Sequence, residues 1–98
     1  MKSNFKDMLA EIDENILLAD GFDEAIVGYI ERAGSSNTIA CYDKNKCIEI
    51  LAKDMTHEEA VEYFYFNTAG AYMGEYTPCF FTTLEAGDRQ WKHLLKNV

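Results

Sequence analysis

Three cysteines and two histidines are the side chains that could perform nucleophilic or metal chemistry in this chain of 98 residues. The thiols belong to Cys41, Cys47 and Cys79, and the imidazoles to His57 and His93. A Cys–His nucleophile requires only that one thiol and one imidazole meet in space, so their spacing along the chain leaves that arrangement open. His57 stands at a predicted helix start, where a solvated residue is the simpler interpretation. We therefore expect no enzyme and assign no catalytic residue.

The same five side chains are a poor set of metal ligands. Cys41 and Cys47 are six residues apart with no second pair after them, whereas zinc modules usually show two tightly spaced pairs. An odd number of cysteines is also a poor disulfide framework. Each cysteine has apolar neighbours, so we expect three free thiols that act as small buried side chains. We assign no metal ligand and expect no cofactor.

The charge of the chain is strongly negative and unevenly distributed. Seventeen acidic residues against nine basic ones give a net charge of −8. Eight acids and no base lie between Lys6 and Arg32, and seven acids and no base lie between Lys53 and Arg89. Such a field repels nucleic acid and attracts basic protein surfaces. We expect no direct nucleic-acid binding, and a partner protein with a basic surface. The alternative is that the charge serves only solubility.

Length and composition indicate one globular domain over residues 1–98. A chain of this size can bury a modest core. Apolar residues make up 48% of the sequence, which is typical of folded rather than disordered chains. No apolar run approaches the roughly 20 residues that span a bilayer, and residues 1–9 lack the apolar stretch of a signal peptide. We expect a cytoplasmic protein without membrane contact.

The longest segment with a single helical pattern is residues 56–76, THEEAVEYFYFNTAGAYMGEY. Thr56 and Glu59 have the spacing of a capping box, which predicts the helix start. The aromatic residues at positions 63–66 are consecutive, and at 3.6 residues per turn they point nearly all the way round a helix. We expect a helix that is either covered on several sides or shows rings to a partner. Asn67 interrupts the apolar centre, so we expect a buried, hydrogen-bonded amide, with ligand binding as the second interpretation.

The remaining sequence predicts short elements around this helix. Apolar spacing favours a helix over residues 4–19. Residues 22–32 and 38–42 favour an antiparallel hairpin with a turn at 33–37, although 23–32 could also start a helix. Asp43 can cap a helix over 44–53. Residues 79–83 form a strand candidate after Pro78, residues 85–88 a turn, and residues 89–96 a helix with Trp91, Leu94 and Leu95 on one edge.

These elements predict an α+β fold. We expect a small antiparallel sheet of about three strands packed against helices, in the order α-β-β-α-α-β-α.

Three blocks of this sequence resemble a group of small proteins encoded by bacteriophages and by phage-derived regions of bacterial genomes. The blocks are ADGFDEAIVGYIERAG (19–34), IACYDKNKCIEIL (39–51) and MTHEEAVEYFYFNTAGAYMGEYTP (55–78). The similarity covers roughly residues 17–81. No block is a catalytic motif and the group has no established activity, so it implies no functional residues. The resemblance implies a phage-type protein that acts in the cytoplasm of a bacterial host.

Charge and context together lead to three hypotheses for function. The first is a stoichiometric binder that covers a basic surface, such as the nucleic-acid channel of a host defence nuclease, as an anti-CRISPR protein does. The second is a structural or accessory protein that self-associates through the aromatic helix and buries the extra rings between protomers. The third is a small enzyme that uses cysteine, histidine or carboxylates. For the first hypothesis, the expected contacts are acids together with an aromatic anchor; these are Asp20, Asp23, Glu24, Glu31, Glu58, Glu59, Glu62, Tyr63 and Tyr65.

Overall fold

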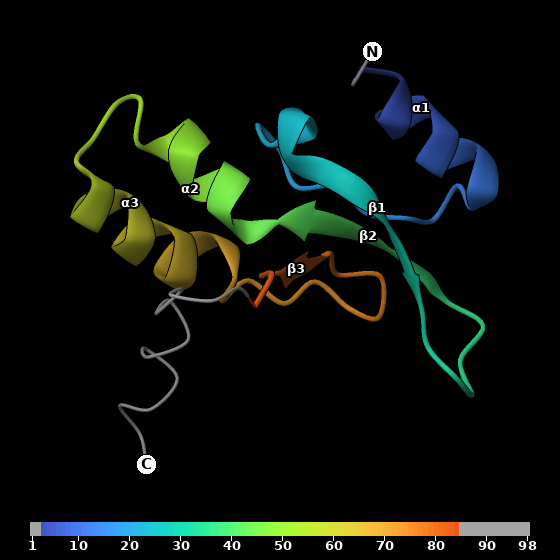
Figure 1. Cartoon of the computed structure of the whole chain (residues 1–98). Helices are drawn as coiled ribbons and strands as arrows, with labels where there is room; N and C mark the ends of the chain where they lie inside the picture. Colours follow the sequence, from blue (N-terminus) through green and yellow to red (C-terminus); the bar gives the residue numbers. More distant parts are fainter. Residues whose placement is uncertain (1–2, 85–98) are drawn as a thin grey trace.

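The computed structural model describes residues 3–84 and has an α+β architecture (Figure 1). This confirms the fold class and the order of the expected elements as far as the third strand. The predicted turn at 85–88 and helix at 89–96 lie outside the described residues. The elements are α1 (Ser3–Ile12), the 3-10 turn η1 (Asp23–Ala25), β1 (Ile26–Glu31), β2 (Thr38–Asp43), α2 (Lys44–Leu51), α3 (His57–Tyr63), the π-helical turn η2 (Phe64–Thr68) and β3 (Cys79–Phe81).

The sheet has the strand order β1-β2-β3. β1 and β2 form the expected antiparallel hairpin, with Ile30 opposite Ile39. The strand interpretation is confirmed for residues 26–31, whereas residues 23–25 form the helical turn η1. β3 instead runs parallel to β2, with Cys41 opposite Cys79. The sheet is therefore mixed, and the prediction of a purely antiparallel sheet was wrong for the third strand. Parallel neighbours need a long crossover connection, which α2, α3 and the loop after η2 supply.

The first helix is shorter than its apolar pattern predicted, because it ends at Ile12 rather than at residue 19. The Asp13 carboxylate accepts a hydrogen bond from the backbone N–H of Asn15 at 2.9 Å, a local turn that competes with continued helix. Leu9 is buried, whereas Met8 and Ile12 on the expected apolar face are exposed. Residues 13–22 then cross to the sheet as irregular chain (Figure 1).

The starts of α2 and α3 agree with their sequence signals. Asp43 accepts hydrogen bonds from two backbone N–H groups in the first turn of α2. The capping box is also confirmed, because the N–H of Glu59 donates to Thr56 Oγ1 at 3.1 Å and the N–H of Thr56 donates to Glu59 Oε1 at 3.0 Å.

The end of the main helix differs from the prediction. Regular α-helix stops at Tyr63, and a π turn closes with a 2.7 Å hydrogen bond from the N–H of Ala69 to the carbonyl of Phe64. A Cβ at Gly70 would lie 3.1 Å from the carbonyl oxygens of Tyr65 and Phe66, so a larger residue there would require the backbone to shift by a few tenths of an ångström. The chain leaves the helix here, and no helix extends to residue 76.

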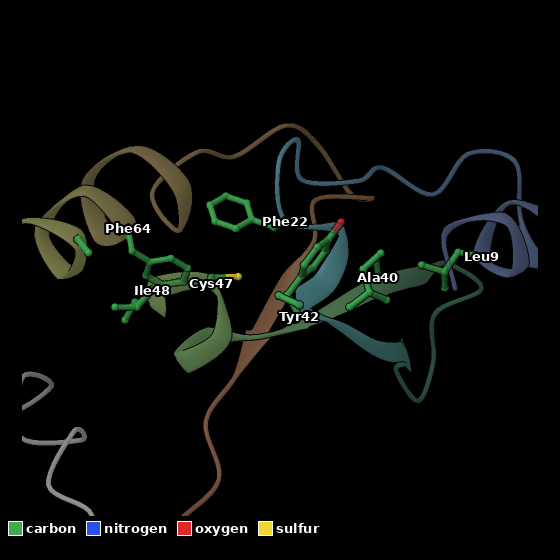
Figure 2. Close-up of a cluster of buried hydrophobic side chains, with 10 residues drawn as sticks. Leu9, Phe22, Ala40, Tyr42, Cys47, Ile48 and Phe64 are labelled. Atoms are coloured by element: carbon green, nitrogen blue, oxygen red, sulfur yellow. The ribbon is translucent and has the colours of Figure 1, made fainter. Parts of the chain in front are cut away.

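The core runs in a line from α1 across β2 to the α2–α3 pair (Figure 2). Tyr42, Phe64 and Cys47 are its largest fully buried side chains. The Phe80 ring from β3 meets Phe64 edge-on at a centroid distance of 5.0 Å and lies 5.7 Å from the Tyr42 ring. β3 thus joins the sheet to the helix pair. All three cysteines are free thiols; Cys41 and Cys47 are buried as expected, whereas Cys79, also expected to be buried, is half-buried.

Candidate protein-binding groove

A groove of about 460 Å³ opens between the segment that precedes η1, the end of α2 and the chain that follows η2. We call it the central groove. Its lining is mainly apolar, and the structure gives it these residues: Leu18, Ala19, Asp20, Gly21, Phe22, Ile50, Leu51, Tyr63, Asn67, Thr68, Ala69, Ala71, Met73, Thr77, Pro78 and Phe80.

One wall of the groove is held in place by the buried sheet. The backbone N–H of Ala19 donates to the Tyr42 hydroxyl oxygen at 2.7 Å, which fixes irregular chain against β2. Gly21 then turns the chain with a φ of +88°, a left-handed conformation that suits glycine. Phe22 is buried immediately afterwards. The turn therefore leaves the Asp20 carboxylate exposed at the rim.

The opposite wall is a loop that is closed by one threonine. Thr77 Oγ1 accepts a hydrogen bond from the N–H of Met73 at 2.7 Å and donates to the carbonyl of Gly74 at 2.6 Å. The Asn37 amide reaches this loop from the β1–β2 turn and donates to Glu75 Oε1 at 2.8 Å. These contacts define the loop although it has no regular secondary structure.

Asn67 lies on the lining and is exposed, so the expectation of a buried amide was wrong. The π turn changes which positions face the core. It buries Phe64 and leaves Asn67 on the open side of the helix.

Large apolar side chains are exposed on residues 63–73, a stretch that also contributes several residues to the groove lining. Phe66 is 86% exposed and Tyr72 is 77% exposed, and Met73 is exposed as well. Tyr63 is 44% exposed and also lines the groove. The main helix therefore both packs against the core and shows rings to solvent, which the run of aromatic residues had indicated. Sequence reasoning missed Met73 as a lining residue because it extended the helix to residue 76, and it did not single out the exposed Phe66 and Tyr72.

Tyr65 faces a different environment from Tyr63. Its hydroxyl oxygen accepts a 2.8 Å hydrogen bond from Lys44 Nζ, and that ammonium group lies 5.4 Å from the Tyr65 ring centroid. Lys44 is buried and Tyr65 is half-buried. Of the two rings named as anchors, Tyr63 is the one that opens on the groove.

The expected acidic contacts lie on separate elements. Asp20 is at the rim of the groove, and Glu58, Glu59 and Glu62 are on α3. Asp23 and Glu24 begin η1, and α2 contacts both η1 and α3. Glu31 ends β1, at the opposite end of that strand from η1. The structure brings Asp20 and Tyr63 together in the lining of one groove, and the other expected acids are not part of that lining.

Few of these carboxylates have a basic partner within residues 3–84. Ion pairs in this range join Lys6 to Asp23 at 3.5 Å and Lys46 to Glu49 at 3.9 Å, both between exposed side chains. Glu59 is engaged in the helix cap. Asp20 is the one charged residue in the groove lining, and no lysine, arginine or histidine of the described range lines it. The groove is therefore mainly apolar and carries one carboxylate, that of Asp20.

The thiols are arranged for packing rather than for nucleophilic chemistry. Burial raises the pKa of the Cys47 thiol to about 12, with a smaller contribution from the nearby Asp43 carboxylate. Burial and the adjacent Cys41 likewise raise the pKa of Cys79 to about 12. A thiol must ionise to attack. These two cysteines are therefore poor nucleophiles near neutral pH.

The described part of the chain was also compared with what a histidine-dependent site, a metal site or a membrane-spanning helix would need. His57 is exposed on the first turn of α3, and His93 lies outside the described residues. Residues 3–84 contain no group of three or more histidine, cysteine or acidic side chains that could hold a metal ion. None of the helices in this range is both long enough and apolar enough to cross a bilayer.

Comparison with protein-family models, with curated proteins and with solved structures gives no match for this chain. The function is therefore argued from the groove and the surface around it.

Proposed function

We propose that this protein acts by binding one partner protein through the central groove and the rings beside it, and that the partner presents a basic surface. The observation that carries the proposal is the exposure of Phe66 and Tyr72, which stand next in sequence to the groove-lining residues Asn67 and Ala71. Aromatic side chains dominate the binding energy of many interfaces. Apolar patches of this kind on a soluble protein commonly mark interaction sites.

The charge of the chain supports the choice of partner. A net charge of −8 accelerates encounter with a positively charged surface and disfavours nucleic acid. The basic channel of a nucleic-acid enzyme is a surface with this character. The specific form of the proposal is an inhibitor that covers the channel of a host defence nuclease, in the manner of an anti-CRISPR protein.

The test compares tagged full-length protein with the variants Phe66→Ser and Tyr72→Ser in pull-downs from a bacterial host. Tyr29→Ser is the matched control, because Tyr29 is also an exposed ring but lies on β1. We expect wild type and Tyr29→Ser to recover one basic protein at low salt. Phe66→Ser and Tyr72→Ser should not recover it. Added salt should weaken its binding, because exposed charges are screened. Equal recovery with Tyr72→Ser and wild type would refute the proposal.

The exposed rings also support a second candidate function, a homodimer that buries Phe66 and Tyr72 between two copies. Apolar burial depends little on salt, in contrast to attraction between opposite charges. Sedimentation at micromolar concentration separates the two functions. A dimer that persists in high salt and dissociates in Phe66→Ser favours self-association, whereas a monomer under both conditions excludes it.

A further inference from the structure

Residues 89–98, which we call the C-terminal segment, have the chemistry of an occupant for the central groove, and they follow a short stretch that carries Glu85 and Asp88. The last ten residues contain three bases and no acid. Trp91, Leu94 and Leu95 have the spacing of one helical face. An apolar edge flanked by cations complements an apolar groove whose one charged lining residue is Asp20. We infer that the C-terminal segment docks into the central groove of its own chain.

The connection to the groove is short enough for this docking. Phe80 is part of the lining, and Leu84 is the last described residue, four positions later. An extended chain covers about 3.3 Å per residue, so Trp91 can reach any point within roughly 35 Å of Phe80. The molecule measures 36 × 32 × 27 Å. The sequence at 85–88 favours a turn, which allows the chain to reverse toward the groove.

Docking in the same chain would make the segment a competitor of the partner. Two sites joined by a short linker meet at an effective concentration in the millimolar range. To displace the segment from the groove, a partner would then need a contact surface that is more basic or more apolar than the segment. The groove would thus reject weakly basic proteins and accept a strongly complementary one. This regulatory role rests on the proposed function, whereas the docking itself does not.

Trp91 provides a direct probe, because it is the single tryptophan of the chain. In full-length protein we expect its fluorescence to be shielded from acrylamide compared with the same protein in urea. The shielding should not depend on protein concentration. Emission that is quenched equally in native and unfolded protein would overturn the inference. Shielding that grows with concentration would also overturn it, because the segment would then occupy a second copy.

Charge variants at the rim test whether the groove is the docking site. Asp20→Lys places a cation opposite the basic segment and should lower the ratio of docked to undocked segment about fivefold to tenfold at low salt. Glu24→Lys is the matched control, since it makes the same charge change four residues away at a position outside the lining. Trp91 should become accessible in the first variant only. Equal effects of the two variants would refute the groove as the site.

A second measurement keeps the test independent of any folding defect in a rim variant. Ala69 and Ala71 lie in the lining, so their amide resonances should shift when Leu94→Asp and Leu95→Asp are introduced together. The Ala40 resonance, in the buried centre of β2, should not change. Unchanged Ala69 and Ala71 resonances would refute docking. Because none of these readouts involves a partner, their failure is distinguishable from failure of the proposed function.

Discussion

The backbone N–H of Ala19 donates a 2.7 Å hydrogen bond to the hydroxyl oxygen of Tyr42, which is completely buried in the central strand. A phenol in the middle of the sheet thus holds a wall of the central groove. The bond satisfies a backbone donor on irregular chain, where no ladder or helix supplies an acceptor. The position of the Asp20 rim therefore depends on the core as well as on the local turn.

Replacing Tyr42 with phenylalanine should destabilise the protein by about 1–3 kcal/mol, because the Ala19 N–H then lacks its acceptor. Urea unfolding measures this loss. Tyr29→Phe is the control, since the Tyr29 ring is about half exposed and its variant should stay within about 0.5 kcal/mol of wild type. If both variants have the wild-type free energy of unfolding, the hydrogen bond contributes nothing to stability.

Two phenylalanines in the same π turn should respond oppositely to truncation. Phe64 is 1% exposed and packs on Phe80, so Phe64→Ala should cost about 3–5 kcal/mol. Phe66 is 86% exposed, and Phe66→Ala should change the free energy of unfolding by less than about 0.5 kcal/mol. Chemical denaturation of the pair checks the register of η2. If Phe66→Ala were the more damaging change, the burial of Phe64 and the exposure of Phe66 in η2 would be contradicted.

The capping box at the start of α3 should make a measurable contribution to the free energy of unfolding. Thr56→Ala removes the hydroxyl that accepts from the Glu59 N–H and should cost about 1 kcal/mol. Thr83→Ala, at an exposed position after β3, provides the matched substitution and should be nearly neutral. Thermal unfolding of both variants compares them. A neutral Thr56→Ala would mean that water replaces the cap at no cost.

Stability should fall at alkaline pH because the buried thiol of Cys47 resists ionisation. Its pKa is raised from 9.0 to about 12, chiefly by burial. The unfolded chain loses this proton first, so the stabilisation is complete below pH 9.0 and is lost as pH rises toward 12. The slope from this one group is at most about 1.4 kcal/mol per pH unit. Burial also raises the pKa of Tyr42 above 10.0, which adds to the loss at higher pH.

The control for this pH dependence is Cys47→Ala, measured by urea unfolding at a series of pH values from neutral to alkaline. This variant should start from a lower stability, because a buried side chain is truncated, but it should lose stability less steeply above pH 9.0. An unchanged slope would assign the alkaline loss to other groups, such as Cys79, whose pKa is also raised to about 12.

The sequence predicted those features that depend on interactions between residues close together in the chain. Asp43 and the Thr56–Glu59 pair predicted two helix starts, because a cap satisfies N–H groups within three positions of itself. The β1–β2 hairpin followed from two short apolar runs on either side of a turn cluster. The acidic charge and the excess of rings were also evident from composition alone.

Only the tertiary structure decided which of these residues meet. The parallel direction of β3 depends on a pairing between distant segments, and neither it nor the π turn that exposes Asn67 was evident from the local sequence. Local propensity is too weak to determine such features, because packing against the rest of the chain outweighs it. The central groove arises in the same way. Asp20 and Tyr63 are 43 positions apart in the chain, and they line one cavity because the Tyr42 and Phe80 rings hold their segments together in the core.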